Sequence, residues 1–245
     1  MKKYLLILPL FSFLVSCQQN KPTGAETAGN TTDSTTILND PKNRINLQIS
    51  NFTEIDSSGI LMLPLTTGES AKYSDRSSYK EIPYNSYWNI IFFNGKTNEY
   101  HLLTDKKILI REHHLKYGDD YRLHTELKVN YIFYTATIDD YDRDKKLTQQ
   151  DPVYLFISDK EGNHFRQISP GGYNLRNWQY IKSLDKVILT AQKDSDNNKT
   201  FDDKDEIMAF EIIVDKESEP KEILSFDFKN ELKILFDRDW KRLDD

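Results

Sequence analysis

Two acidic segments of this chain carry the side chains best suited to bind a metal ion. We number each segment 1 to 12 from its first aspartate and compare its oxygen donors at positions 1, 3, 5, 9 and 12. In segment 140–151 these donors are Asp140, Asp142, Asp144, Thr148 and Asp151. In segment 194–205 they are Asp194, Asp196, Asn198, Asp202 and Asp205. Calcium is a hard cation that takes about six to eight oxygens, and alternate side chains of a tight loop point inward. We therefore expect each segment to bind Ca²⁺ weakly, with the position 7 carbonyl of Lys146 or Thr200 as a further ligand.

The spacing resembles the calcium loop of EF-hand proteins, with two differences. Position 6 is glycine in that loop, whereas this chain has Lys145 and Lys199 there, and position 12 is Asp rather than Glu. Leu147 and Phe201 at position 8 are expected to fix each loop to the core. The second segment is the better predicted site, because it has an acid at position 9 and fewer lysines. The alternative interpretation is a pair of solvated hairpin loops in which Asp and Asn only form turns.

The two segments occupy the same place in an internal repeat. Residues 130–158 align with residues 184–212 at an offset of 54 without a gap, and both copies read strand, acidic loop, strand. An earlier stretch, 89–104, resembles 153–169 less closely. A repeat of about 40–55 residues with about four strands is typical of a β-propeller blade.

The elements that must position these loops are predicted to be β-strands. The chain has 14 Tyr and 13 Phe, which both favour strands, and Gly- or Asn-rich turns separate the apolar runs. The expected strands are 60–65, 88–93, 99–103, 107–111, 129–138, 152–157, 164–168, 175–181, 186–192, 206–214 and 222–226. The fold class is therefore all-β, a partial or irregular β-propeller of about three four-stranded repeats plus a C-terminal helix.

The C-terminal residues 227–245 predict the helix. Asp227 is the expected cap, and Phe228, Leu232, Leu235 and Phe236 recur near a 3.6-residue period. We expect this apolar stripe to pack against the β domain, residues 42–226.

Residues 153–194 resemble the repeat of TolB-type β-propellers. The matching positions are Asp159 and Gly162 in a turn, Arg166–Ser169 in a short strand, and Trp178 in the strand that follows. The resemblance covers 130–226 well and 58–104 loosely, and it implies a propeller fold. A closed propeller has about four to eight blades, so about three repeats imply a partial one. The whole chain also resembles lipoproteins of Bacteroidetes, from which no activity carries over.

The N-terminus predicts a secretory signal. Lys2 and Lys3 precede the apolar run Tyr4–Val15, which is shorter than the roughly 20 residues that span a bilayer and suits a signal peptide. The run ends in Leu-Val-Ser-Cys, which resembles the bacterial lipobox and implies that residues 1–16 are removed and Cys17 is lipidated. The alternative is an ordinary signal peptide with a chance cysteine. Cys17 is the only cysteine, so neither a disulfide nor a cysteine metal site is possible within the mature chain.

Residues 17–41 predict a flexible tether between the lipid and the domain, because they are polar and rich in Thr, Asn and Gly. Asp33-Ser34-Thr35 resembles an O-glycosylation triplet of Bacteroidetes. Gln18 stands where an inner-membrane retention signal has Asp, so we expect an outer-membrane lipoprotein, with the periplasmic face favoured over the cell surface. The net charge of −6 falls to about −8 when Lys2 and Lys3 are removed (−6 minus 2), which argues against binding to nucleic acid.

No enzyme signature is present in the sequence. His113 and His114 are adjacent, and on a strand they would face opposite sides, which suits no shared metal. We expect a non-catalytic, monomeric binding or scaffold protein, anchored to the membrane by its lipid, with an envelope protein, peptidoglycan or a glycan as partner. The competing prediction is a carbohydrate-active or other envelope hydrolase.

Overall fold

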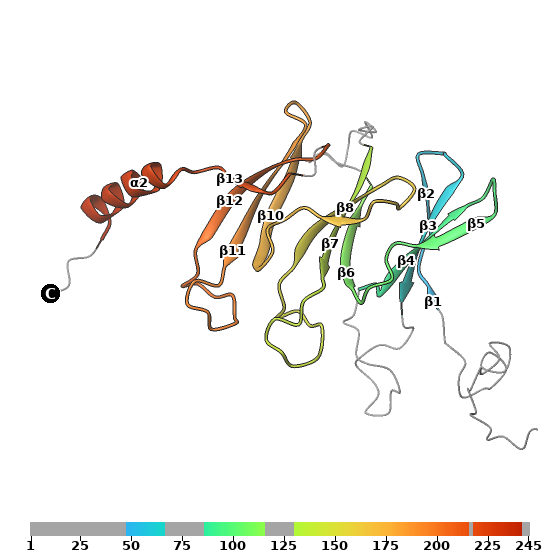
Figure 1. Ribbon diagram of the computed structural model, residues 1–245, viewed down its shortest axis with the longest axis horizontal. Coiled ribbons are helices and arrows are strands. Elements are labelled where there is room, and N and C mark those ends of the chain that lie inside the picture. Colours follow the sequence, from blue (N-terminus) through green and yellow to red (C-terminus); the bar gives the residue numbers. More distant parts are fainter. Residues whose placement is uncertain (1–47, 67–85, 116–129, 216–217, 242–245) are drawn as a thin grey trace, which may run out of the picture. The chain divides into compact units, whose positions relative to one another are not determined.

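The structure is a computed structural model that describes residues 48–66, 86–115, 130–215 and 218–241 (Figure 1). The described residues belong to one compact unit, Asn46–Asp245. The signal segment, Cys17, the predicted tether and all other residues before the first strand lie outside the described residues.

Three antiparallel sheets follow one another along the chain (Figure 1). The first sheet comprises β1 (Gln48–Ile49), β2 (Thr53–Ile55), β3 (Ile60–Thr66), β4 (Asn89–Asn94) and β5 (Glu99–Leu102). The second comprises β6 (Leu109–His114), β7 (Tyr131–Thr137), β8 (Tyr154–Asp159) and β9 (Arg166–Gln167). The third comprises β10 (Tyr173–Ile181), β11 (Lys186–Lys193), β12 (Ile207–Ile213) and β13 (Lys221–Glu222). In the second and third sheets, each strand pairs with the next one in sequence.

The second sheet is buried on both faces. Side chains of a strand alternate between faces, and in β7 Ile132 and Tyr134 join a core cluster with Met62 and Phe92 of the first sheet. Phe133 joins a second cluster, formed with the third sheet. This double burial explains why apolar and aromatic residues follow one another without polar alternation in the first part of β7 and β8.

The second and third sheets repeat the same irregularity. The pairing of the first two strands shifts between Ile110 and Glu112 in the second sheet and between Leu175 and Asn177 in the third. The extra residue of each bulge is an arginine, Arg111 or Arg176. A β-bulge bends its strand and redirects a side chain. An arginine is therefore the bulged residue at equivalent positions of the two sheets.

The ungapped repeat alignment is wrong by one residue in its first strand. Thr135 pairs with Leu155, and Thr190 pairs with Ala209. Equivalent residues of the second strands, β8 and β12, are therefore 54 residues apart in sequence. Equivalent residues of the first strands, β7 and β11, are 55 residues apart. The third sheet has one residue fewer between its strand β11 and the acidic loop.

The C-terminal helix α2 spans Phe226–Asp239, so the prediction of a strand up to Phe226 is wrong. Its N-cap is Ser225 rather than Asp227, and the Ser225 hydroxyl accepts a hydrogen bond from the backbone N–H of Phe228. Asp227 lies in the first turn, where a carboxylate favours the helix dipole.

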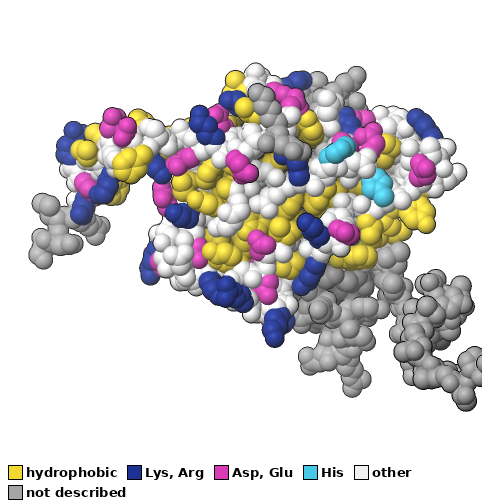
Figure 2. Space-filling model, in the orientation of Figure 1, with side chains coloured by type: hydrophobic (Ala, Val, Ile, Leu, Met, Phe, Trp, Pro, Cys, Tyr) yellow, Lys and Arg dark blue, Asp and Glu magenta, His cyan; other side chains and the backbone are white. Residues whose placement is uncertain are grey.

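The predicted packing of the helix against the β domain is also wrong. No residue of α2 is buried, and the apolar side chains of its stripe are 42–58% exposed (Figure 2). Lys229 forms ion pairs with Glu206 and Glu222 of the third sheet, so polar contacts join its first turns to that sheet.

The prediction of an all-β fold with a C-terminal helix is confirmed. None of the three sheets in the described part of the chain is closed. Among the described residues, no helix has the length and hydrophobicity needed to cross a membrane.

Candidate metal centre

The two acidic segments are the loops that join the second and third strands of consecutive sheets. The first loop, 140–151, connects β7 to β8, and the second loop, 194–205, connects β11 to β12. Both lie at the same end of neighbouring sheets (Figure 1). The repeat predicted from the sequence therefore places two chemically similar loops side by side.

The position 12 aspartates close both loops in the same way. Asp151 accepts hydrogen bonds from the backbone N–H groups of Tyr141 (2.8 Å) and Thr148 (2.7 Å). Asp205 accepts from the equivalent positions 2 and 9, which are Ser195 (2.7 Å) and Asp202 (3.0 Å). Asp151 and Asp205 are both buried, and the paired N–H donors offset part of the cost of burying their charge.

In each loop, the position 1 aspartate accepts a hydrogen bond from the backbone N–H of position 6. The backbone N–H of Lys145 donates to Asp140 Oδ2 at 2.8 Å, and that of Lys199 donates to Asp194 Oδ2 at 3.0 Å. Both lysines have the positive φ that glycine adopts most readily, 70° for Lys145 and 65° for Lys199. The sharp turn of a calcium loop therefore forms without glycine at position 6.

Each loop brings three carboxylates within reach of one cation. One oxygen each from Asp140, Asp142 and Asp144 lies within 4.8 Å of the others in the first loop. In the second loop the grouped carboxylates are Asp194, Asp196 and Asp205, at positions 1, 3 and 12 rather than 1, 3 and 5.

The other predicted ligands lie outside these two groups. Asp151 uses both carboxylate oxygens on backbone N–H donors, and Asp202 accepts from the N–H of Lys204. The Thr148 hydroxyl donates to Asp151, and the Asn198 amide oxygen accepts from the N–H of Thr200. The role expected for the carbonyls of Lys146 and Thr200 stays a prediction.

Two buried oxygens at the loops have no hydrogen-bond partner among the described residues. One is Asp140 Oδ1 at position 1 of the first loop, and the other is Gln192 Oε1 at the end of β11. Gln192 is 4% exposed, and its Nε2 donates to the carbonyl of Asp202, which places the amide against the second loop. A buried oxygen without a partner costs about 1–3 kcal/mol, and a bound cation would remove that cost. The donors at both loops therefore fit a hard cation.

Sequence reasoning missed Gln192, although a signal existed. It is a polar residue in an otherwise apolar strand, two positions before the first aspartate of the loop.

Asp194 is the most buried carboxylate of the second loop's ligand group, at 5% exposed. Its burial acts to raise its pKa, but hydrogen bonds from the Tyr141 hydroxyl and from backbone N–H groups, including those of Lys199 and Asn198, outweigh burial and lower the pKa. The carboxylate is therefore ionised at neutral pH, as a calcium ligand must be.

The two loops differ in the group that supports them from behind. Arg111 extends from the bulge of β6, and its Nη2 donates to Thr137 Oγ1 (3.1 Å) and to the carbonyls of Thr148 (3.2 Å) and Asp151 (3.4 Å). Burial lowers the pKa of Arg111, and the charge of Asp151 partly opposes this effect. In the third sheet the equivalent Arg176 is exposed.

The loops also differ in their own charge. The first loop has four carboxylates and three cationic side chains, whereas the second has five carboxylates and two. The more negative second loop, which no buried arginine supports among the described residues, is the stronger candidate cation site.

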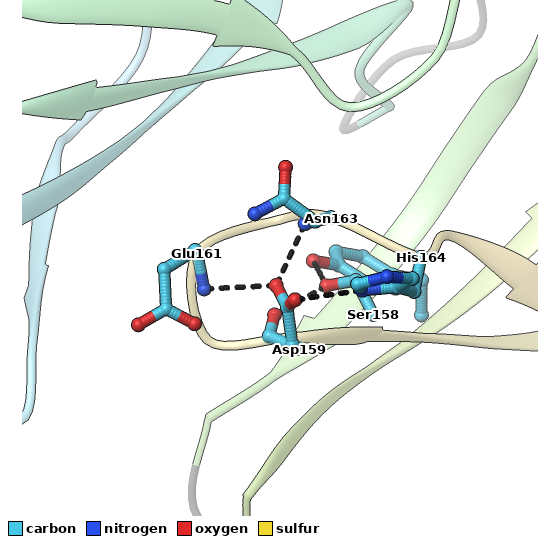
Figure 3. Close-up of polar contacts among 6 residues, drawn as sticks. Ser158, Asp159, Glu161, Asn163 and His164 are labelled. Atoms are coloured by element: carbon cyan, nitrogen blue, oxygen red, sulfur yellow. Dashed lines mark hydrogen bonds and ion pairs between the residues drawn. The ribbon is translucent and has the colours of Figure 1, made fainter.

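The residues that resemble the TolB-type repeat have structural roles. Asp159 closes the turn between β8 and β9, because its Oδ1 accepts the N–H groups of Glu161 (3.1 Å) and Asn163 (2.7 Å) and its Oδ2 contacts His164 Nδ1 at 3.0 Å (Figure 3). Arg166 donates to the carbonyl of Val214, and the Trp178 ring stacks on Phe133. Asp159 thus orders a turn within the second sheet, whereas Arg166 and Trp178 join the second sheet to the third.

The adjacent histidines face different neighbours, as expected for a strand. His113 lies against the ring of Tyr87, and His114 meets the edge of Trp178. The two imidazoles therefore do not converge on a shared metal.

One polar cavity lies apart from the loops. It has a volume of about 530 Å³ and is lined by Arg166, Gln167, Ile168, Ser169, Gly171, Ser218, Glu219 and Pro220. Its charged and hydroxyl groups could hydrogen-bond a polar ligand.

Comparison of the chain with known protein families, curated proteins and solved structures found no match.

Proposed function

We propose that this protein is a non-catalytic binding or scaffold protein of the cell envelope whose β-sheets are stabilised by Ca²⁺ in the two acidic loops. One observation carries the proposal. The two loops repeat the same backbone hydrogen bonds at positions 1, 6 and 12 in consecutive sheets, and each is associated with a buried, unpartnered oxygen. In each loop, three carboxylate oxygens also lie within 4.8 Å of one another, and a bound cation would offset the repulsion between these charges.

The ligand chemistry favours calcium among the common cations. The donors are all oxygens, which suits a hard cation, and no cysteine or histidine belongs to either group. Magnesium demands a tight octahedron and keeps its waters, whereas these flexible Asp side chains suit a larger ion. We expect a dissociation constant of roughly 0.1–1 mM, as in extracellular modules.

We interpret the three sheets as blades of an open β-propeller. Two four-stranded meanders with matching bulges, and a middle sheet buried on both faces, support this interpretation. The other face of the third sheet is mixed, because the ion pair of Lys186 with Glu211 (2.7 Å) lies beside their cross-strand partners Ile213 and Ile188.

The envelope location rests on the lipobox-like sequence at Cys17. A lipid there would anchor the protein to the outer membrane, and the polar residues 18–41 would let the domain reach a protein or glycan partner.

Calorimetric titration of the unlipidated mature protein with CaCl₂ tests the calcium proposal. We expect two sites in the stated range and much weaker heats with MgCl₂. Asp194→Ala with Asp196→Ala should remove one site, and Asp140→Ala with Asp142→Ala should remove the other. Asp159→Ala is the control, since this aspartate closes a turn outside the loops.

Thermal unfolding gives an independent readout. Calcium at about ten times Kd stabilises by about 1.4 kcal/mol per site, which raises Tm by roughly 3–6 °C for a domain of this size. The calcium proposal is wrong if titration gives no heat and a chelator leaves the melting curve unchanged.

A further inference from the structure

Tyr141 is a residue of the first loop that reaches the second loop. It occupies position 2 of the first loop, where its backbone N–H donates to Asp151 at 2.8 Å. Its hydroxyl donates to Asp194 Oδ2 at 2.9 Å, and its ring lies 5.2 Å from the ring of Phe201. Through its backbone N–H and its side chain, this one residue thus joins the last position of the first loop to positions 1 and 8 of the second.

The contact at Asp194 falls on a carboxylate that already organises the second loop. Asp194 Oδ2 also accepts the N–H of Lys199, and Oδ1 accepts that of Asn198 at 3.1 Å. The Tyr141 hydroxyl therefore fixes the plane of this carboxylate.

A separate observation indicates that the second loop takes a ligand. Gln192 is almost fully buried, its amide reaches the Asp202 carbonyl, and its Oε1 has no partner among the described residues. A cation bound beside this amide in the second loop would supply that partner.

We propose that Tyr141 is a positioning residue through which the first loop sets the calcium affinity of the second. The inference rests on the proposed calcium binding. A cation in the first loop orders the backbone around Tyr141 and Asp151. The hydroxyl then holds Asp194 in its binding geometry before the second cation arrives, so less ordering remains to be done on binding. Thermodynamic linkage requires the second cation to strengthen binding at the first loop by the same factor.

The expected coupling is about five-fold in affinity, at the low end of the usual range for coupled sites. Calorimetric titration with CaCl₂ measures it in four forms of the unlipidated mature protein. These are the natural sequence, Tyr141→Phe, Asp140→Ala with Asp142→Ala, and the triple variant. Tyr141→Phe keeps the ring on Phe201 and removes only the hydroxyl.

With the natural tyrosine at position 141, loss of the first loop's site should weaken the second site about five-fold. In the Tyr141→Phe variant, the second site should already be weaker, and loss of the first site should change it no further. Tyr154→Phe is the matched control, because Tyr154 also donates to an aspartate beside the first loop, Asp139 at 2.8 Å, but its hydroxyl contacts no residue of the second loop among those described. It should leave the coupling intact.

Two results overturn the inference while leaving calcium binding in place. One is equal weakening of the second site with and without the Tyr141→Phe substitution, and the other is no weakening in either background. Absence of any calcium heat in the natural sequence overturns the proposed function itself. If the first-loop variant does not fold, the calcium isotherms of the natural sequence and of Tyr141→Phe are compared instead. The isotherm should be cooperative for the natural sequence and should fit two independent sites for Tyr141→Phe, and identical shapes overturn the inference.

Discussion

Gly162→Ala should destabilise the protein by disturbing the contact between the first and second sheets. Gly162 lies in the turn between β8 and β9 with φ of +82°. A Cβ atom at this position would lie 2.3 Å from Cδ2 of Phe92, a buried residue of β4. The glycine is therefore required both by its backbone conformation and by the aromatic ring packed on it.

The chain offers a control that separates these two requirements. Gly172 has a similar φ of +76°, but no atom lies within 4 Å of a Cβ built there. Placing alanine in the left-handed region costs about 1–2 kcal/mol, and forcing a group into a packed core costs about 1–3 kcal/mol more. Gly172→Ala should incur only the first cost, whereas Gly162→Ala should incur both, for a total of about 2–5 kcal/mol.

Thermal and urea unfolding, followed by circular dichroism in the presence of a chelator, measure the difference. At about 2–4 °C per kcal/mol, Gly162→Ala should lower Tm by roughly 10 °C and Gly172→Ala by roughly 4 °C. Equal shifts for the two variants would refute the reasoning, because the ring of Phe92 would then not press on this turn.

Three further predictions concern the loop support, the third sheet and the lipid. Arg111→Met should lower the free energy of unfolding by about 1–3 kcal/mol, because it leaves carbonyls of the first loop without a donor. The control Arg176→Met, at an exposed position, should change this free energy by less than about 0.5 kcal/mol. Similar urea midpoints for the two variants would contradict the prediction. The hydrogen bond and charge of Lys186 lower the pKa of Glu211. The ion pair therefore stabilises the folded state fully above the ordinary pKa range of Glu, and this stabilisation is lost as the pH falls through the lowered pKa. The unfolding free energy of Glu211→Gln, measured across the same pH range, should lack this loss. Cys17→Ser should leave an unlipidated precursor in the aqueous phase of a detergent separation, and recovery of the variant with membranes would show that Cys17 is not lipidated.

The loops could be predicted from sequence because their chemistry depends on spacing alone. Aspartates at positions 1, 3 and 12 recur in both copies, and the structure brings three carboxylates together in each loop. The support behind the loops could not be predicted in this way. Arg111 is 29 residues before the first loop in sequence (140 minus 111), and only the bulge in β6 directs it there.

The one-residue error in the repeat alignment has a physical cause. Alternation of apolar and polar residues marks the register of a strand when one face is solvated. β7 is buried on both faces, so its apolar residues fall at odd and even positions alike. The sequence pattern of β7 therefore does not indicate which face each residue occupies. For this reason it does not reveal that the third sheet has one residue fewer between β11 and its acidic loop.

The helix shows a related limit. A 3.6-residue stripe predicts that a helix has an apolar face, and α2 has one. The pattern does not state what covers that face. Ser225 and Asp227 are both good N-cap residues, and only the hydrogen bond from Phe228 to Ser225 distinguishes them.

The differences between the two loops give the proposed coupling a direction. Arg111 places a fixed positive charge behind the first loop, whose own charges nearly balance. The second loop carries a larger excess of carboxylates, with the neutral amide of Gln192 against it. The second loop therefore gains more from a bound cation, because more carboxylate repulsion is relieved. The second loop should therefore fill first. Through the hydrogen bond of Tyr141 to Asp194, its cation then strengthens binding at the first loop by the factor that reciprocal coupling requires.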